Sequence, residues 1–186
     1  MKRIFCLETE WRQDIHDLKD KSTAHSILEF YESALNVPYV FRKVASLSDF
    51  DYYIRHLQYP SYNNYDVIYL CFHGTRGKIH FADKAEIKLS EFALEYKDIF
   101  ADKTIIFDSC YSLNMSAEQV SEFKSLTGAR IIAGYTKSVD SVRSFVFEIW
   151  LLSMLASHPE YGSKRLSAAA EKEMPAHTRS LGFVCY

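Results

Sequence analysis

The sequence is poor in glycine and has no glycine-rich phosphate loop. Only six glycines occur among its 186 residues. Neither the GxGxxG pattern of dinucleotide-binding folds nor the GxxxxGK pattern of P-loop proteins is present, and both patterns supply the close backbone amides that hold phosphate groups. No stretch rich in proline, glycine or serine divides the chain either. We therefore predict one domain over residues 1–186, without a nucleotide or other cofactor.

Cysteine is also scarce, and its spacing matches neither a disulfide framework nor a zinc ribbon. The four cysteines, none of them in a CxxC pair, are Cys6, Cys71, Cys110 and Cys185. Three of them fall inside or beside apolar runs that resemble buried strands. This pattern is typical of a reduced protein whose thiols are mostly buried.

Long runs of one charge sign and long apolar runs are missing as well. The formal net charge is −2, which argues against nucleic acid or an anionic membrane surface as a partner. The longest apolar run, residues 145–156, contains Glu148 and is too short to span a bilayer. The apolar stretch near the N-terminus ends at Glu8, which is too early for a signal peptide. We expect a soluble, cytoplasmic protein.

Apolar runs alternate with helical patterns along the whole chain. The runs predict strands at residues 3–8, 39–44, 66–73, 104–110, 130–135 and 181–185. The 3.6-residue period predicts helices that begin at Ser22, Ser48, Ser90 and Ser116, an apolar helix at 141–156 and a helix at 163–173. Residues 78–81 and 86–89 are patterned as a small hairpin. Near-continuous apolar strands that alternate with helices predict a mostly parallel sheet covered by helices on both faces.

Two neighbouring predicted strands end in residues that can do chemistry together. One run ends at His73 and the next at Cys110, and ligands bind at the carboxyl edge of open α/β sheets. A nearby imidazole or helix N-terminus favours the thiolate, which is the nucleophile. Attack on a carbonyl would give a thioester, with His73 donating and then accepting the proton. The backbone amides of Gly74 and Cys110 are the natural oxyanion donors, because glycine permits a close approach of the substrate.

The same residues allow less specific interpretations. His73 and Cys110 can be ordinary strand ends with no chemical role. Zinc is a weaker alternative, because Cys71, His73 and Cys110 offer three ligands but no CxxC or HxxxH pair completes the set. We therefore predict no metal.

Four features occur in a set order: a strand ending in His73-Gly74, the hairpin segment at 77–89, a strand ending in Asp108-Ser109-Cys110, and Gly134-Tyr135 leading through a loop to an apolar helix. In this order they resemble the caspase-like cysteine peptidases, which include caspases, metacaspases and CHAT-domain proteins. The resemblance spans nearly the whole chain. Papain-like enzymes and glutamine amidotransferases place the cysteine first, so the order is the discriminating part.

The resemblance implies a three-layer α-β-α fold whose six-stranded sheet has the order 2-1-3-4-5-6, with only the last strand antiparallel. It implies that His73 is the general acid and base and that Cys110 is the nucleophile. By the same resemblance, the expected substrate-binding residues are Asp108, Glu8, Glu10, Tyr135 and Asp140. Acidic side chains among them favour an arginine or lysine at P1, the substrate residue before the scissile bond.

Departures from the family pattern leave other hypotheses open. Metacaspases usually have His-Ser-Gly after the cysteine, whereas this chain has Tyr111-Ser112-Leu113, and no acidic cluster indicates a calcium site. One alternative is a catalytically inactive caspase-like module that binds a protein partner. Another is a flavodoxin-like domain for a small ligand. Under the peptidase hypothesis the partner is a protein or peptide substrate, and a requirement for an activating protein or a homodimer stays open.

Overall fold

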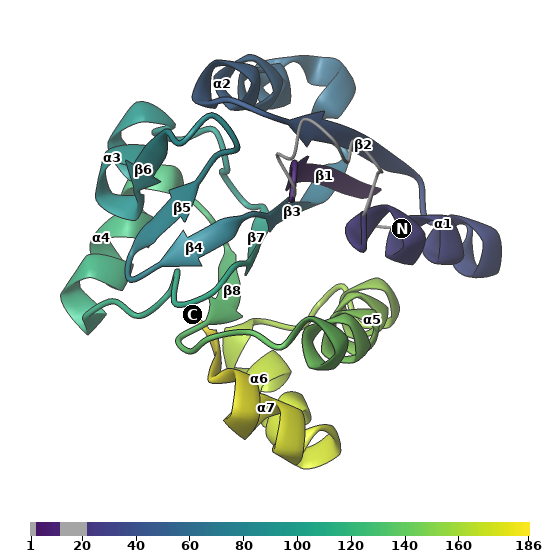
Figure 1. Ribbon diagram of the computed structural model, residues 1–186. Coiled ribbons are helices and arrows are strands. Elements are labelled where there is room, and N and C mark those ends of the chain that lie inside the picture. Colours follow the sequence, from purple (N-terminus) through teal and green to yellow (C-terminus); the bar gives the residue numbers. More distant parts are fainter. Residues whose placement is uncertain (1–2, 12–21) are drawn as a thin grey trace, which may run out of the picture.

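A six-stranded sheet lies at the centre of the computed structural model, which describes residues 3–11 and 22–186 (Figure 1). Its order is β2-β1-β3-β7-β8-β9, and every neighbouring pair is parallel except β8 with β9. The strands are β1 (Arg3–Thr9), β2 (Tyr39–Val44), β3 (Tyr65–Cys71), β7 (Thr104–Asp108), β8 (Ile131–Tyr135) and β9 (Phe183–Cys185). The predicted strand order and the antiparallel last strand are confirmed.

Helices cover both faces of this sheet, as Figure 1 shows. One face carries α2 (Leu47–Arg55), α3 (Leu89–Glu95) and α4 (Ala117–Thr127). The other carries α1 (Ala24–Leu35), α5 (Ser141–Ser157), α6 (Ser163–Glu173) and α7 (Pro175–Leu181). Two short 3-10 turns, η1 (His56–Gln58) and η2 (Pro60–Tyr62), follow α2. None of the helices in the described part of the chain is long and apolar enough to cross a membrane.

The middle positions of the central strands are apolar because each strand contributes side chains to two cores. In β7, Ile105 and Phe107 pack into the core under α2, α3 and α4, while Ile106 between them packs into the core under α1 and α5. Successive side chains of a strand point to opposite faces, so a strand buried on both sides needs an apolar residue at nearly every position. The predicted three-layer α/β fold is confirmed.

A second, three-stranded antiparallel sheet projects from the end of β3. It consists of β4 (His73–Thr75), β5 (Lys78–His80) and β6 (Glu86–Lys88), in that order. The predicted hairpin is confirmed, but the predicted extent of the third strand is wrong. That strand ends at Cys71, and His73 opens the small sheet instead, because its partner there is His80 of β5.

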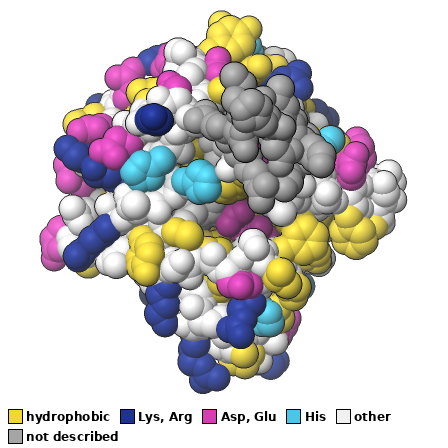
Figure 2. Space-filling model, viewed as in Figure 1, with side chains coloured by type: hydrophobic (Ala, Val, Ile, Leu, Met, Phe, Trp, Pro, Cys, Tyr) yellow, Lys and Arg dark blue, Asp and Glu magenta, His cyan; other side chains and the backbone are white. Residues whose placement is uncertain are grey.

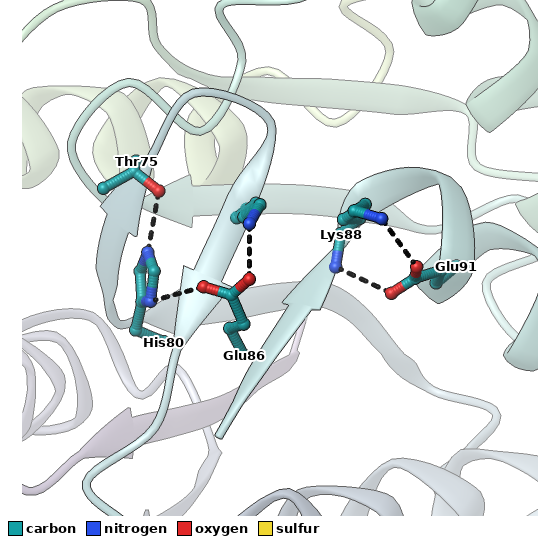
Figure 3. A network of polar contacts seen from close by, with 6 residues as sticks. Thr75, His80, Glu86, Lys88 and Glu91 are labelled. Atoms are coloured by element: carbon teal, nitrogen blue, oxygen red, sulfur yellow. Dashed lines mark hydrogen bonds and ion pairs between the residues drawn. The ribbon is translucent and has the colours of Figure 1, made fainter. Parts of the chain in front are cut away.

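Polar contacts link the strands of the small sheet on its outer face (Figure 3). The Thr75 hydroxyl lies 2.7 Å from Nε2 of His80, and Nδ1 of His80 lies 3.5 Å from a carboxylate oxygen of Glu86. Lys78 pairs with Glu86, and Lys88 pairs with Glu91 at the start of α3. These side chains are partly exposed, so the pairs add little stability individually, but together they connect all three strands.

Two of the helix caps predicted from the sequence are displaced, those of α1 and α2. The N-cap of α1 is Thr23 rather than Ser22, although the Ser22 hydroxyl accepts from the amide of His25. Ser116 and Gln119 form the expected reciprocal capping box of α4, and Gly128 ends that helix with φ +72°. For α2 the cap is Ser46 rather than Ser48, because Asp49 completes a capping box with Ser46. The sequence also gave no prediction of α7, a seven-residue helix that begins at Pro175.

Replacing Ser46 with alanine tests the corrected cap. We expect Ser46→Ala to lower the free energy of unfolding by about 1 kcal/mol, because the amide of Asp49 loses its acceptor. The matched variant Ser48→Ala should change it by less than about 0.5 kcal/mol. Urea denaturation of both variants measures the difference, and an equal loss in both would contradict the assignment of the cap.

Candidate active site

The candidate dyad lies where β3 and β7 end side by side. Cys71 and Asp108 are the last register partners of these two parallel strands, and His73 and Cys110 each follow two residues later. A Cβ built on Gly74 would lie 2.4 Å from the carbonyl oxygen of Cys110 and 3.2 Å from its nitrogen. The segments that carry the histidine and the cysteine are therefore in direct backbone contact.

A cavity of about 350 Å³ opens beside the dyad. We call this space the dyad cavity. It is lined by Trp11, Thr23, Phe72, His73, Asp108, Ser109, Cys110, Val139, Ser141, Ser144, Phe145 and Glu148. Figure 2 shows this face of the molecule, where histidine side chains lie beside a hollow that contains acidic side chains and has hydrophobic side chains near its rim. The lining contains two carboxyl groups, and the described residues contribute no lysine or arginine to it.

The Cys110 sulfur is half-buried and accepts a backbone hydrogen bond. The amide of Val139 donates to it over 3.2 Å, and the Ser138 hydroxyl lies 3.9 Å away. An N–H aimed at the sulfur stabilises negative charge there. The Cys110 amide itself donates no hydrogen bond to any other described residue.

The His73 ring is exposed and packs against an aromatic side chain. Its centroid lies 4.8 Å from that of Trp11, and the two planes meet at 88°. The indole N–H of Trp11 donates to Oε1 of Glu8 over 2.8 Å. Glu8 is the second-last residue of β1, the strand next to β3, so three adjacent strands deliver residues to this edge.

Two buried carboxyl groups share a hydrogen bond at the inner end of the cavity. Burial raises the pKa of Asp108 to about 6. Burial and then the negative charge of Asp108 raise the pKa of Glu148 well above its ordinary value, so Glu148 holds the proton of the pair. The hydroxyls of Tyr69 and Tyr135 donate to the two oxygens of Glu148, over 2.5 and 3.1 Å. Burial raises the pKa of both phenols, which stay neutral donors.

The other predicted substrate-binding residues occupy different positions around this cavity. Glu8 is fully buried behind the wall that Trp11 forms, and Glu10 is exposed and outside the lining. Tyr135 supports Glu148 from behind. Asp140 caps α5, where its carboxylate accepts from the amide of Arg143 over 2.9 Å. The structure therefore brings His73, Cys110 and Asp108 together, with Tyr135 one contact away.

Cys71, the third ligand in the zinc alternative, points away from the cavity. It is fully buried in the core under α1 and α5, where its thiol contacts that of Cys6. Burial raises the pKa of both thiols. Residues 3–11 and 22–186 contain no cluster of three or more histidine, cysteine or carboxylate side chains suited to a metal ion.

Sequence reasoning missed two residues of the site, Glu148 and Trp11. The sequence does contain an indication of Glu148, because a single carboxylate in an otherwise apolar helix is costly to bury and indicates a specific partner or ligand. Trp11 has no such indication. It follows the first strand, but only the fold shows that its ring reaches His73.

The sheet order, the antiparallel last strand and the helices on both faces define a three-layer α/β protein. The chain belongs to a family of unknown function, DUF6642, whose model matches residues 1–175. No curated protein matches its sequence. Caspase-1 from Spodoptera frugiperda is a similar solved structure, with 14% identity, a TM-score of 0.49, and coverage of 84% of this chain and 67% of the caspase chain. A likeness of this degree assigns no activity.

Adding a side chain at Gly74 tests the backbone contact on which the site is built. We expect Gly74→Ala to destabilise the protein by about 1–3 kcal/mol, because the new methyl group collides with the Cys110 carbonyl. Gly162→Ala is the control, since a Cβ there has no atom within 4 Å, and its effect should stay within about 0.5 kcal/mol. Thermal and urea unfolding measure both, and equal effects would show that the contact is not tight.

The buried carboxyl pair predicts a stability that falls as pH rises. Asp108 titrates at about 6 in the folded state and near 3.8 when unfolded. Between these values the folded state binds more protons, so unfolding becomes easier with increasing pH, by about 3 kcal/mol for Asp108 alone. In Glu148→Gln the side-chain amide does not titrate and can donate a hydrogen bond to Asp108. The free energy of unfolding should therefore fall less with increasing pH in this variant than in wild type.

Urea denaturation between pH 4 and pH 7 measures this slope in wild type and Glu148→Gln. The control is Glu122→Gln on the exposed face of α4, which should keep the wild-type slope. A wild-type slope in Glu148→Gln would contradict the assignment of the shared proton.

Proposed function

We propose that this protein is a cysteine endopeptidase in which Cys110 is the nucleophile and His73 is the general acid and base. The single observation that carries the proposal is the backbone contact between Gly74 and Cys110 at the mouth of the dyad cavity. It holds an imidazole and a half-buried thiol on two adjoining segments beside a space large enough for a side chain. Nucleophilic catalysis needs this juxtaposition.

In the proposed reaction, His73 takes the proton of the Cys110 thiol, and the sulfur attacks the carbonyl carbon of a peptide bond and forms a C–S bond. The C–N bond then breaks, and His73 gives its proton to the leaving amine. A water molecule attacks the resulting thioester while His73 accepts one of its protons. The C–S bond breaks, the carboxylic acid leaves, and the proton returns to the dyad.

The backbone amides of Gly74 and Cys110 are the proposed oxyanion donors. Their segments touch, and the Cys110 amide has no partner among the described residues. Preorganised N–H groups at the developing oxyanion lower the barrier because they need no reorganisation during the reaction.

The acidic end of the dyad cavity supports a basic residue at P1. Asp108 and Glu148 line it with no cationic partner of their own in the described chain, and desolvated carboxyl groups without a counter-charge are costly. A substrate guanidinium can bind two carboxylate oxygens in parallel. Because its positive charge favours both ionised carboxylates, its entry would release the proton of Glu148.

The test uses acyloxymethyl-ketone probes on wild type and Cys110→Ala. We expect covalent labelling of wild type at Cys110 and none in the variant, whose fold is checked by circular dichroism. His73→Gln should lower the labelling rate by at least about 100-fold, within the range typical of a lost general acid and base. Hydrolysis or labelling that persists in Cys110→Ala would overturn the proposal.

A pair of probes that differ only in charge tests the P1 preference. Arginine and citrulline have nearly the same shape, but only arginine carries a positive charge. We expect arginine to react faster, and Asp108→Asn to reduce this advantage by about 100-fold, because the variant lacks the ionised partner. No labelling with any probe in folded protein would favour the alternative, a module that binds a protein partner.

A further inference from the structure

We propose that Trp11, held by Glu8, is a positioning residue that fixes the plane of the His73 imidazole. The proposal rests on the proposed role of His73 as a base, and it assigns the two residues a function other than substrate binding. An imidazole that moves protons for a nucleophile is normally oriented by a third group. Here the third group is an aromatic ring rather than a hydrogen-bond acceptor.

The first observation is the absence of a polar partner for His73. Within residues 3–11 and 22–186, no hydrogen bond or ion pair reaches either of its ring nitrogens. Its ring meets the indole of Trp11 nearly at right angles, with centroids 4.8 Å apart. A ring packed this closely limits how far the exposed imidazole can rotate about its Cβ–Cγ bond.

The second observation is that Trp11 is itself anchored to the core. Its indole N–H donates to Oε1 of Glu8 over 2.8 Å. The same oxygen accepts the amides of Thr23 and Ala24 at the start of α1, over 3.2 and 3.3 Å. Glu8 is fully buried, and its second oxygen has no partner among the described residues. The carboxylate therefore connects β1, the start of α1 and the indole.

The neighbouring histidine shows what His73 lacks. His80 is the register partner of His73 across β4 and β5. Its ring nitrogens contact Thr75 and Glu86, as Figure 3 shows. Two imidazoles thus lie side by side in one small sheet, one held by polar groups and the other by Trp11. His80 is a matched control for His73.

Fluorescence tests the contact without any catalytic readout. Trp150 is the only other tryptophan, so Trp150→Phe leaves Trp11 as the single emitter. Indole emission depends on the groups packed against the ring, so we expect His73→Gln to change the emission intensity of Trp11. His80→Gln should leave that emission unchanged. Unchanged emission in His73→Gln would overturn the proposal.

Alkylation of Cys110 by iodoacetamide tests the consequence for the dyad. We expect Trp11→Leu to lower the rate between about 10-fold and 100-fold, as expected for a base that is displaced rather than removed, and to alter its pH profile. Trp11→Phe should recover most of the rate because an aromatic ring remains. Glu8→Gln should behave like wild type, because its amide oxygen still accepts from the indole, whereas Glu8→Met should resemble Trp11→Leu.

Two outcomes separate this inference from the proposed function. If wild type cleaves no peptide but Trp11→Leu lowers the alkylation rate of Cys110 and alters its pH profile, positioning stands and the peptidase assignment fails. If wild type cleaves peptides and Trp11→Leu, folded by circular dichroism, keeps wild-type cleavage and alkylation profiles, the positioning role is wrong and the peptidase assignment stands.

Discussion

The close approach of Gly74 to the backbone of Cys110 is the constraint on which the rest of the site depends. It exists because β3 and β7 are parallel neighbours whose last paired residues are Cys71 and Asp108. Two residues beyond that pair, the chains diverge into β4 on one side and the Cys110 loop on the other. A side chain at Gly74 would force them apart, so the smallest residue is required where the backbones touch.

Near this contact, carboxyl and hydroxyl side chains that water would normally solvate are buried at the edge of the sheet. The Asp108 and Glu148 carboxyls and the Tyr69 and Tyr135 hydroxyls form one buried network, which spans strands β3, β7 and β8 and helix α5. Its members satisfy one another only while one carboxyl keeps a proton. Such a network costs stability near neutral pH, and functional sites are where such costs are commonly found. Because these two buried carboxyl groups have no cationic partner among the described residues, the cavity is suited to bind a cation.

Much of this architecture is readable from local pattern. A strand such as β7 is recognisable because burial on both faces requires a run of apolar residues. The capping box of α4 is recognisable because Ser116 and Gln119 are only three residues apart. The sequence predicts too long a third strand, because nothing in it shows that the chain leaves the large sheet after Cys71 and that His73 pairs with His80. The seven residues of α7 are too few for a clear period, and its packing against α5, α6 and β9 supports it.

The residues of the candidate site also fall into two groups, those that the sequence indicates and those that only the tertiary structure brings to the site. His73 and Cys110 could be named from the sequence, because each lies beside the end of an apolar run and parallel strands end at one edge. Asp108 follows from the family resemblance. Glu8 could be placed at that edge but not oriented, and its carboxylate turns to Trp11 and the start of α1 instead of to the cavity. Glu148 and Trp11 join the site from 38 residues after Cys110 and from the segment after β1. Distances along the chain carry no information about such contacts, because they arise only when α5 and the end of β1 pack against the same sheet edge.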